Sequence, residues 1–393
     1  MYRMLAEVRM ARIVEAIGQY RTGRLSCLEA AEVLGFSERH FRRLRDRYEA
    51  EGAEGIVDRR LGRASARRAP ADRIEWVLEQ YRTRYWDFTA KHFHEHLVRD
   101  HGFEYGYTWT KARLQETGLV KRARRRGAHR KRRPRRPMPG MMLFQDGSPY
   151  RWIPALDHDL DLIATMDDAN SEVYSAFLVE EEGTMSSFEG LSETVDEHGL
   201  FCSFYTDRGS HYFHTRKAGG KVDKEHPTQV GRALSQLGIE HIPSYSAQAR
   251  GRMERLFGTL QKRLPQELRL AGIGTIEEAN RYIREVFLPA FNGQFAVTPA
   301  ERGTAFVPYV GRELADILCV HEERIVGNDN CVRYNGLVLQ IPEHAHRRHF
   351  VKATVKVHEY PDRSLAVFHG PRCLGRYDEK ATLNEERTEK RAA

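Results

Sequence analysis

Two apolar runs in the middle of the chain each end in an aspartate that is followed by turn residues. Residues 141–145 lead into Asp146, and residues 200–206 lead into Asp207. Short apolar runs bounded by turn residues are typical of buried strands. The sequence therefore predicts two strands, each of which presents a carboxylate at its C-terminal end. Any fold for this chain must bury both strands and still leave both carboxylates accessible to a ligand.

A third carboxylate, Glu254, lies in a segment with helical periodicity. Apolar residues recur there at spacings of three and four, at Met253, Leu256, Phe257, Leu260 and Leu264. This spacing predicts an amphipathic helix with one buried face. Glu254 borders that face, so it can lean over the edge of the sheet.

These three acidic residues together suit a magnesium site. Mg²⁺ prefers oxygen ligands, and two such ions can hold the attacking and leaving oxygens of an in-line displacement at a phosphodiester. Carboxylates packed closely repel each other unless a metal neutralises them. We therefore predict that Asp146, Asp207 and Glu254 are catalytic residues that bind two Mg²⁺ ions, with Mn²⁺ as a substitute.

The segments around these residues resemble bacterial insertion-sequence transposases of the ISNCY type. Those enzymes belong to the integrase-like Asp-Asp-Glu superfamily, and the resemblance covers most of the chain. It implies an RNase H-like catalytic core with Asp146, Asp207 and Glu254 as its acidic residues. One departure is the spacing of 47 positions between Asp207 and Glu254 (254 − 207), which is longer than usual. We assign the excess to a polar loop at 215–228.

Two other acidic residues are weaker alternatives to Glu254. Glu225 lies inside the polar loop, and Glu240 lies in a short predicted strand. Asp167 and Asp168 also end a predicted strand, at 160–167. We expect this pair to form a hairpin turn, because Asp readily hydrogen-bonds the local backbone there.

The apolar pattern predicts a multidomain chain with all-α modules first, an α/β core and a small β-barrel last. The core is expected to run β-β-β-α-β-α-β-α, and the family resemblance supplies its order of strands in space. The predicted boundaries are a helix-turn-helix domain at 1–56, a basic linker at 57–70, a second helical or winged-helix-like module at 71–120, an Arg/Lys-rich linker at 121–140, the catalytic core at 141–300, a linker at 301–321, an SH3-like barrel at 322–378 and a flexible tail at 379–393.

The first domain carries clear helix signals. Ser26 and Glu29 form a predicted capping box, Gly35 ends that helix, and Ser37 caps the next one. Two helices joined by a short glycine turn are typical of a helix-turn-helix, whose second helix enters the major groove of DNA. The residues expected to contact DNA there are Ser37, Arg39, His40, Arg42 and Arg43.

The second helical module has a further candidate reading helix, with Thr108, Thr110, Lys111 and Arg113 as expected DNA contacts. His92, His94 and His96 alternate on the preceding helix. Retroviral integrases carry a His-His-Cys-Cys zinc module in this region, but no cysteine occurs here between Cys27 and Cys202. We therefore expect these histidines to be exposed or to cap helices, and we do not expect that zinc module.

A dense basic block separates this module from the core. Such a block repels itself, and neutralising phosphates would give strong, salt-sensitive binding to DNA. Its expected DNA contacts are Lys121, Arg122, Arg124, Arg125, Arg126, Arg130, Lys131, Arg132 and Arg133. Weaker candidates beside the predicted active site are Arg208, Gln248, Arg250 and Lys262.

Composition fits a DNA-acting protein. The 393 residues have a formal charge of +8, which favours a polyanionic partner. The five cysteines are scattered, which indicates a reducing compartment, and we see no signal peptide or membrane span. We expect a cytoplasmic, nucleoid-associated bacterial protein with no membrane partner.

We predict a polynucleotidyl transferase that binds double-stranded DNA. Its substrates would be transposon terminal inverted repeats and target DNA, and it would act as a homodimer or larger assembly because two ends must be joined. One alternative is a non-enzymatic DNA-binding regulator, which leaves the three acidic residues unexplained. Another is an RNase H-like nuclease without strand transfer.

Overall fold

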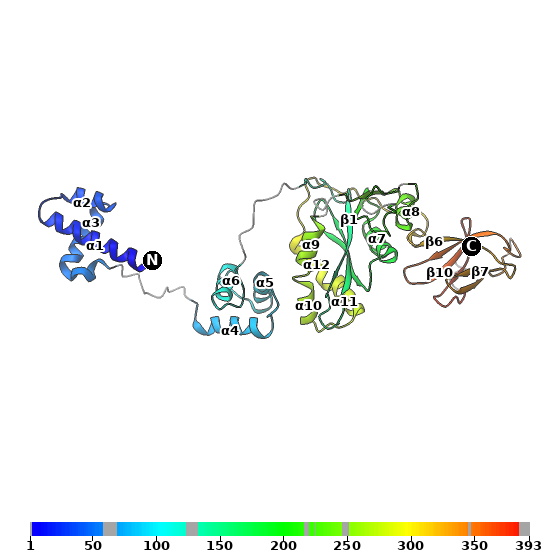
Figure 1. Ribbon diagram of the computed structural model, residues 1–393, viewed down its shortest axis with the longest axis horizontal. Coiled ribbons are helices and arrows are strands. Elements are labelled where there is room, and N and C mark those ends of the chain that lie inside the picture. Colours follow the sequence, from blue (N-terminus) through cyan, green and yellow to red (C-terminus); the bar gives the residue numbers. More distant parts are fainter. Residues whose placement is uncertain are drawn as a thin grey trace. The chain divides into compact units, whose positions relative to one another are not determined.

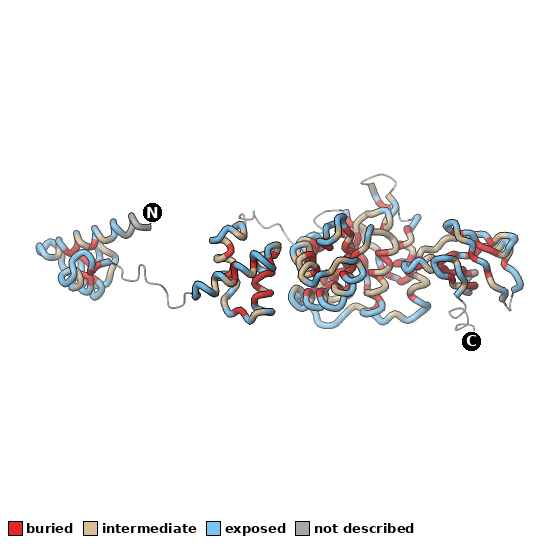
Figure 2. The backbone as a smooth tube through the Cα atoms, turned by 90° about the horizontal axis from the view of Figure 1, so that it is seen from below, coloured by how far each residue is buried: buried red, intermediate tan, exposed pale blue. Residues whose placement is uncertain are grey.

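The computed structural model describes residues 2–57, 69–122, 133–215, 220–223, 225–245, 251–344 and 347–384 (Figure 1). The chain divides into two compact units, residues 1–75 and 76–393. Figure 2 shows that buried positions gather inside each unit, where helices or strands face one another. No helix in the described ranges is long and apolar enough to cross a membrane.

The first unit contains α1 (Tyr2–Arg21), α2 (Cys27–Leu34), α3 (Glu38–Glu51) and the short η1 (Gly52–Ile56). The predicted capping box is confirmed, because the Glu29 N–H donates to Ser26 Oγ at 3.2 Å and the Ser26 N–H donates to Glu29 Oε2 at 2.7 Å. Gly35 ends α2 with φ 69°, a left-handed conformation that suits glycine. Buried side chains of all three α-helices, including Ile17, Ala31 and Phe41, form the core.

The second helical module consists of α4 (Ala71–Thr83), α5 (Ala90–His101) and α6 (Tyr107–Glu116). Its helices lie where the sequence predicts them, but the expectation for the histidines is wrong. His92, His94 and His96 are 2%, 9% and 2% exposed. The physical reason is that α5 packs on two neighbours: His94 contacts α6, and His92 and His96 contact the catalytic domain.

A five-stranded mixed sheet forms the centre of the second unit. The strands are β1 (Leu143–Tyr150), β2 (Leu160–Asp167), β3 (Val173–Val179), β4 (Ser203–Thr206) and β5 (Glu240–Pro243). Their order in the sheet is β3-β2-β1-β4-β5. The first three strands are antiparallel neighbours, whereas β1 pairs with β4, and β4 with β5, in parallel. The predicted β-β-β-α-β-α-β-α order of elements is confirmed.

Helices cover both faces of this sheet (Figure 1). On one face α7 (Thr184–His198) and α8 (Gln229–Gln236) pack around Leu143 and Phe204. The other face packs on α9 (Met253–Leu260), α10 (Leu264–Leu270), α11 (Ile276–Tyr282), η2 (Ile283–Phe287) and α12 (Leu288–Phe295). Burial of both faces explains why the strands read as nearly continuous apolar runs.

Two asparagines close the outer edge of β3. The Val173 N–H donates to Asn292 Oδ1 at 3.0 Å, and Asn292 Nδ2 donates to the Val173 carbonyl at 2.8 Å. Asn280 makes the same pair of bonds with Leu178, at 2.6 and 3.0 Å. Side-chain amides therefore take the place of a neighbouring strand at these positions.

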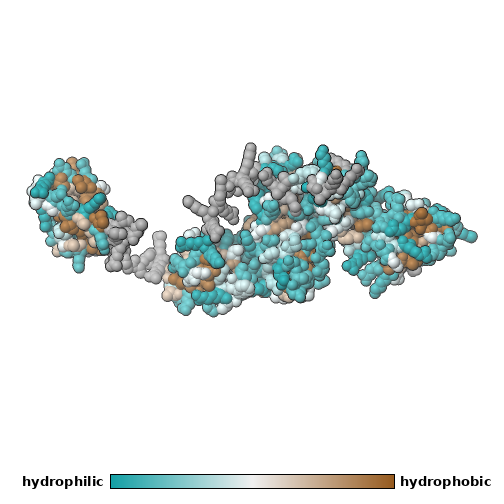
Figure 3. Space-filling model, viewed as in Figure 1, coloured by the Kyte–Doolittle hydropathy of each residue, from teal (hydrophilic) through white to brown (hydrophobic). Residues whose placement is uncertain are grey.

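The C-terminal part begins with η3 (Leu314–Asp316) and continues as strands. It contains β6 (Val320–Ile325), β7 (Cys331–Tyr334), β8 (Leu337–Gln340), β9 (Thr354–Glu359), β10 (Leu365–His369) and β11 (Arg372–Tyr377). They form a four-stranded sheet in the order β11-β10-β9-β6 and a separate β7-β8 hairpin. The predicted strands exist, but the predicted closed barrel is not confirmed in the described residues. In the view of Figure 3 hydrophilic residues cover most of this part, with a few hydrophobic patches.

We expect Gly190→Ala in α7 to destabilise the catalytic domain. A Cβ at Gly190 would lie 2.5 Å from Gln145 Nε2 and 3.2 Å from Thr165 Oγ1. Overpacking of this kind costs about 1–3 kcal/mol. The measurement is urea unfolding, with Gly258→Ala in α9 as the matched control. A Cβ at Gly258 meets no atom within 4 Å, so this change should be neutral or stabilising by up to ~1 kcal/mol. Equal destabilisation by both changes would contradict the close packing of α7 on the sheet.

Candidate catalytic site on the central sheet

The parallel pairing of β1 and β4 puts two predicted site residues side by side. Leu143 pairs with Phe204 and Phe144 with Tyr205. Two residues farther along the chain are Asp146, within β1, and Asp207, directly after the end of β4, so the two aspartates lie at about the same level. Phe144 and Tyr205 belong to the core under α9. Because side chains alternate along a strand, Asp146 faces the same side as Phe144.

Contacts at its two ends fix helix α9 beside β1. Arg252 precedes the helix and forms an ion pair with Asp168, next to the register partner of Leu143. Gln261, which follows the helix, donates from Nε2 to Ser148 Oγ at 3.3 Å. Helix α9 therefore runs from the start of β1 toward its end.

Glu254 lies on the side of α9 that faces β1. It is seven positions before Gln261, which is close to two helical turns, so both residues project from the same face of the helix. Ser148 is two residues after Asp146 and so lies on the same face of β1. The Glu254 residue is exposed, whereas Asp146 is 8% exposed. The three carboxylates thus come from neighbouring elements on one face of the sheet.

The three predicted ligands do not form one tight cluster. Among the described residues, other side chains form the clusters whose metal-binding atoms lie within 4.8 Å of one another. The two aspartates therefore lie at a similar level on the sheet, and the third carboxylate is open to solvent.

Two further polar residues, Glu182 and His211, lie near Gly147, which faces the opposite side of β1 from Asp146, and sequence reasoning missed them. Gly147 lies so close to Glu182 that an added Cβ would be 2.4 Å from its Oε2. Glu182 Oε1 lies 3.4 Å from His211 Nε2. Neither residue has a local sequence signal: Glu182 ends an ordinary acidic run, and His211 follows the second aspartate in a turn. Only the tertiary fold brings Glu182 to Gly147 and His211.

Tyr212 contacts β1 through Gln145, the residue before Asp146. Its hydroxyl donates to Gln145 Oε1 at 2.9 Å. Burial raises the pKa of Tyr212 well above its usual value, and the negative charges of Glu182, Asp146 and Asp207 add to the increase. Tyr212 therefore stays a neutral donor beside three carboxylates. Asp207 is held in turn by the Gly209 N–H, which donates to its Oδ1 at 2.7 Å.

The interpretation of Asp167 as a turn residue is confirmed. The Ala169 N–H donates to Asp167 Oδ1 at 2.6 Å, and the Gly140 N–H donates to Oδ2 at 2.7 Å. Burial raises the pKa of Asp167, and these backbone hydrogen bonds oppose that increase.

Asp168 has a wider role than the turn that the sequence indicates. It is fully buried and pairs with the guanidinium groups of both Arg133 and Arg252. It also accepts the Arg136 N–H at 2.7 Å. Arg133, which we expected to contact DNA, is therefore held at the catalytic domain by this carboxylate.

The expected DNA contacts on α3 lie at the surface. Ser37, Arg39, His40, Arg42 and Arg43 are all exposed. The Ser37 hydroxyl accepts the His40 N–H at 3.3 Å and caps the helix as predicted. Arg42 forms an ion pair with Glu38 at 3.2 Å.

One expected DNA contact on α6 is wrong. Thr110 is fully buried, with its Oγ1 3.1 Å from His94 Nδ1, because it faces α5. Thr108 is exposed, and Lys111 and Arg113 are partly buried. Arg113 pairs with Glu116 at 2.7 Å.

The remaining candidates divide into two groups. Lys121, Arg122 and Lys262 are exposed, and Arg208 donates to the Gly220 carbonyl at 2.8 Å. Eight lie outside the described residues, namely Arg124, Arg125, Arg126, Arg130, Lys131, Arg132, Gln248 and Arg250. The two alternatives to Glu254 are exposed and lie off α9: Glu225 follows Asp223 in a loop, and Glu240 begins β5.

Comparison with known proteins agrees with the transposase resemblance. Residues 14–74 match the winged helix-turn helix family. The chain is 33% identical over 357 residues to the transposase y4bF of Sinorhizobium fredii, covering 90% of this chain and 77% of that protein. The chain belongs to the transposases. It is also 25% identical over 394 residues to the transposase for insertion sequence IS1202 of Streptococcus pneumoniae, covering 88% of this chain and 81% of that one.

Among solved structures, this transposase is similar to a simian T-cell lymphotropic virus intasome chain, with a TM-score of 0.34, 16% identity and coverage of 64% of this chain and 81% of that chain. It is also similar to the HTLV-2 integrase catalytic core domain solved with magnesium, with a TM-score of 0.30, 15% identity and coverage of 42% and 93%. As a transposase, the protein is a DNA-acting polynucleotidyl transferase.

We expect His241 to make the stability of the transposase depend on pH. Desolvation lowers the pKa of His241 to about 3, while its Nε2 lies 3.0 Å from Thr206 Oγ1. The unfolded chain binds a proton near the ordinary pKa of 6.5, so this contribution to stability is present above that pH. It is lost progressively as the pH falls toward 3.

The measurement is the free energy of unfolding between pH 4 and 8 for wild type and His241→Gln. The variant should show a shallower decline below pH 6.5. His226→Gln, at an exposed loop position, is the control and should keep the wild-type slope. An unchanged slope in the His241 variant would show that another group causes the decline.

Proposed function

We propose that this transposase binds the terminal inverted repeats of its insertion sequence and catalyses 3′-end nicking and strand transfer at Asp146, Asp207 and Glu254. The observation that carries the proposal is the similar level of Asp146 in β1 and Asp207 directly after the adjacent parallel strand β4, beside the helix that bears Glu254. We also assign the central domain to the RNase H-like class, because three antiparallel strands are followed by two parallel ones.

The donor chemistry of the site fits magnesium. All three proposed ligands offer carboxylate oxygens, which Mg²⁺ prefers, and an exposed Glu254 leaves room for water ligands and DNA. When bound, two Mg²⁺ ions would activate the attacking oxygen and stabilise the leaving 3′-oxygen, and Mn²⁺ could replace them.

The residues of the chain have separate tasks around that chemistry. Asp146 and Asp207 provide two fixed carboxylates, because β1 and the Gly209 N–H hold them in place. Glu254 provides a third from α9, whose start is tied to Asp168. Arg208, Gln248, Arg250 and Lys262 would hold the phosphates of the transferred strand.

DNA recognition is assigned to the segments before the catalytic domain. In α3, the exposed Arg39, His40, Arg42 and Arg43 suit contact with the major groove. The module at 71–120 and the basic linker at 121–140 would follow the DNA backbone. We keep the domain boundaries that the sequence predicts. Because two transposon ends must be joined, the active form would be a homodimer or larger assembly on nucleoid DNA in the cytoplasm.

We expect Glu254→Gln to abolish nicking and strand transfer while DNA binding remains. The substitution keeps the size of the side chain and removes its charge, so a metal ligand is lost. Loss of one electrostatic partner in a transition state costs roughly a hundredfold or more in rate. The measurement is Mg²⁺-dependent cleavage and joining of labelled end DNA, with binding followed by gel shift.

Glu240→Gln is the matched control, because Glu240 is exposed and lies away from α9. It should act like wild type. Wild-type activity in the Glu254 variant would remove Glu254 from the site. Cleavage without joining by the wild type would favour a nuclease, and tight specific binding without cleavage would favour a regulator.

A second prediction concerns recognition by α3. Arg43→Ala should weaken binding to the cognate end by about 1–3 kcal/mol if Arg43 contacts a base. Arg12→Ala on α1 removes the same charge from another exposed position of this unit, so it serves as the control. Fluorescence anisotropy at several salt concentrations separates the effects, because a phosphate contact lowers the salt slope by about one. Equal losses of binding affinity from both changes would argue against recognition of DNA bases by α3.

A further inference from the structure

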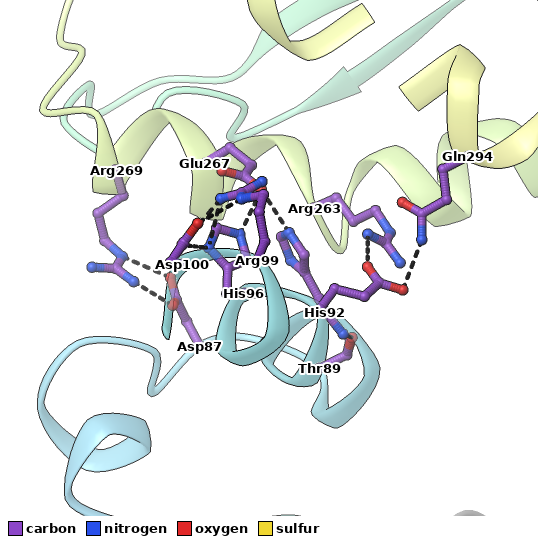
Figure 4. A network of polar contacts seen from close by, with 11 residues as sticks. Asp87, Thr89, His92, His96, Arg99, Asp100, Arg263, Glu267, Arg269 and Gln294 are labelled. Carbon is purple, nitrogen blue, oxygen red and sulfur yellow. Dashed lines mark hydrogen bonds and ion pairs between the residues drawn. The ribbon is translucent and has the colours of Figure 1, made fainter. Parts of the chain in front are cut away.

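Helices α5 and α10 bring together three side chains that none of the functions above uses. His92 and His96 lie one helical turn apart on α5, and Glu267 lies on α10. The Nε2 atoms of both histidines lie 2.8 Å from the same Glu267 oxygen, Oε1 (Figure 4). Two imidazoles and one carboxylate thus point at a common position between the helical module and the catalytic domain.

The cluster is enclosed and its ring geometry is convergent. The side chains of both histidines are 3% exposed and that of Glu267 is 13% exposed. The two imidazole rings are 5.0 Å apart and tilted by 69°. Their nitrogens and the carboxylate oxygen all lie within 4.8 Å of one another. Buried imidazole and carboxylate groups in this arrangement are the ligands that late first-row divalent metals prefer.

The second nitrogen of His96 has two polar neighbours. His96 Nδ1 lies 2.9 Å from Asp100 Oδ2 and 2.9 Å from Arg99 Nη2. Its Nε2 faces Glu267 Oε1 at 2.8 Å. A carboxylate on the outer nitrogen of a histidine is also the usual outer partner of a metal ligand.

We propose that His92, His96 and Glu267 bind one Zn²⁺ ion, with water in the remaining position. Imidazole nitrogen suits zinc better than magnesium, so this site differs in chemistry from the carboxylate site on the sheet. The Cys319–His321–His358 cluster is a poorer candidate. The His321 and His358 rings are stacked 3.8 Å apart at 11°, so their nitrogens lie side by side instead of converging.

The ion would join the helical module to the catalytic domain. Ion pairs flank the site on both sides: Arg269 bonds Asp87 at 2.6 and 2.9 Å, and Arg263 bonds Glu95 at 2.7 Å. Zinc would add a coordinated link between α5 and α10 to these contacts. The proposal is independent of the catalytic assignment, because it requires neither DNA nor Asp146, Asp207 and Glu254.

The test is zinc binding by the full chain after removal of metals with a chelator. Competition with a chromophoric chelator should give one equivalent of Zn²⁺ with a dissociation constant of about 1 µM or lower. Glu267→Gln and His96→Gln should each weaken this binding by about a hundredfold or more, since each removes a ligand. Excess Mg²⁺ should not compete.

His94→Asn is the matched control. It removes a histidine from the same helix that contacts Thr110 instead of Glu267, so zinc affinity should match wild type. Zinc should raise the melting temperature of wild type and of this control, and Co²⁺ should give the visible absorption of a low-symmetry nitrogen and oxygen site. Circular dichroism of each variant without metal shows whether it is folded.

The proposal fails if the metal-free wild type binds no zinc at micromolar concentrations. It also fails if folded Glu267→Gln binds zinc as tightly as wild type. Either result would make the cluster a hydrogen-bonded contact, in which both Nε2–H groups donate to Glu267 and His96 Nδ1 accepts from Arg99. A wild-type protein that binds zinc but does not nick DNA would count against the catalytic assignment alone.

Discussion

The buried carboxylate of Asp168 is the interaction on which the position of the catalytic elements depends. It has no contact with solvent, and it pairs with Arg133 before the core and Arg252 before α9. A buried charge is costly unless it is paired, so these two arginines are constrained to meet it. The chain therefore enters the core and begins α9 at the same point. Because Glu254 follows Arg252 by only two residues, the placement of the third carboxylate depends directly on this ion pair.

Much of the catalytic domain could be predicted from the sequence because its signals are local. The apolar runs before Asp146 and Asp207 lie in strands, and the periodic segment around Glu254 is a helix. The predicted end of the first strand at Asp146 is wrong, because β1 continues to Tyr150 as the antiparallel partner of β2. The capping box at Ser26 and Glu29 is also a local pattern, and it appears as expected. The pairing of β1 with β4 could not be predicted from local signals. No local pattern indicates which strands become neighbours, and the order of strands came from the family resemblance.

The errors share a physical cause, which is contact between residues far apart in the chain. His92 and His96 were expected at the surface, but Glu267 covers them from more than 170 positions away. Thr110 was expected on DNA, yet α5 buries it. Glu182 lies beside Gly147 only because the fold brings the segment after β3 to β1. In the C-terminal part, short alternating runs predicted the strands, whereas barrel closure depends on pairing that the runs do not encode.

The amides of Asn280 and Asn292 have a consequence for how copies of the protein can associate. An open edge strand offers main-chain groups on which another polypeptide can continue the sheet, the step from which fibrous aggregates grow. Along β3 the peptide groups of Val173 and Leu178 are already bonded to side chains. A strand from another chain cannot pair there without displacing both asparagines. The sheet is thus terminated at this border, and contact between protomers across it must use side-chain surfaces.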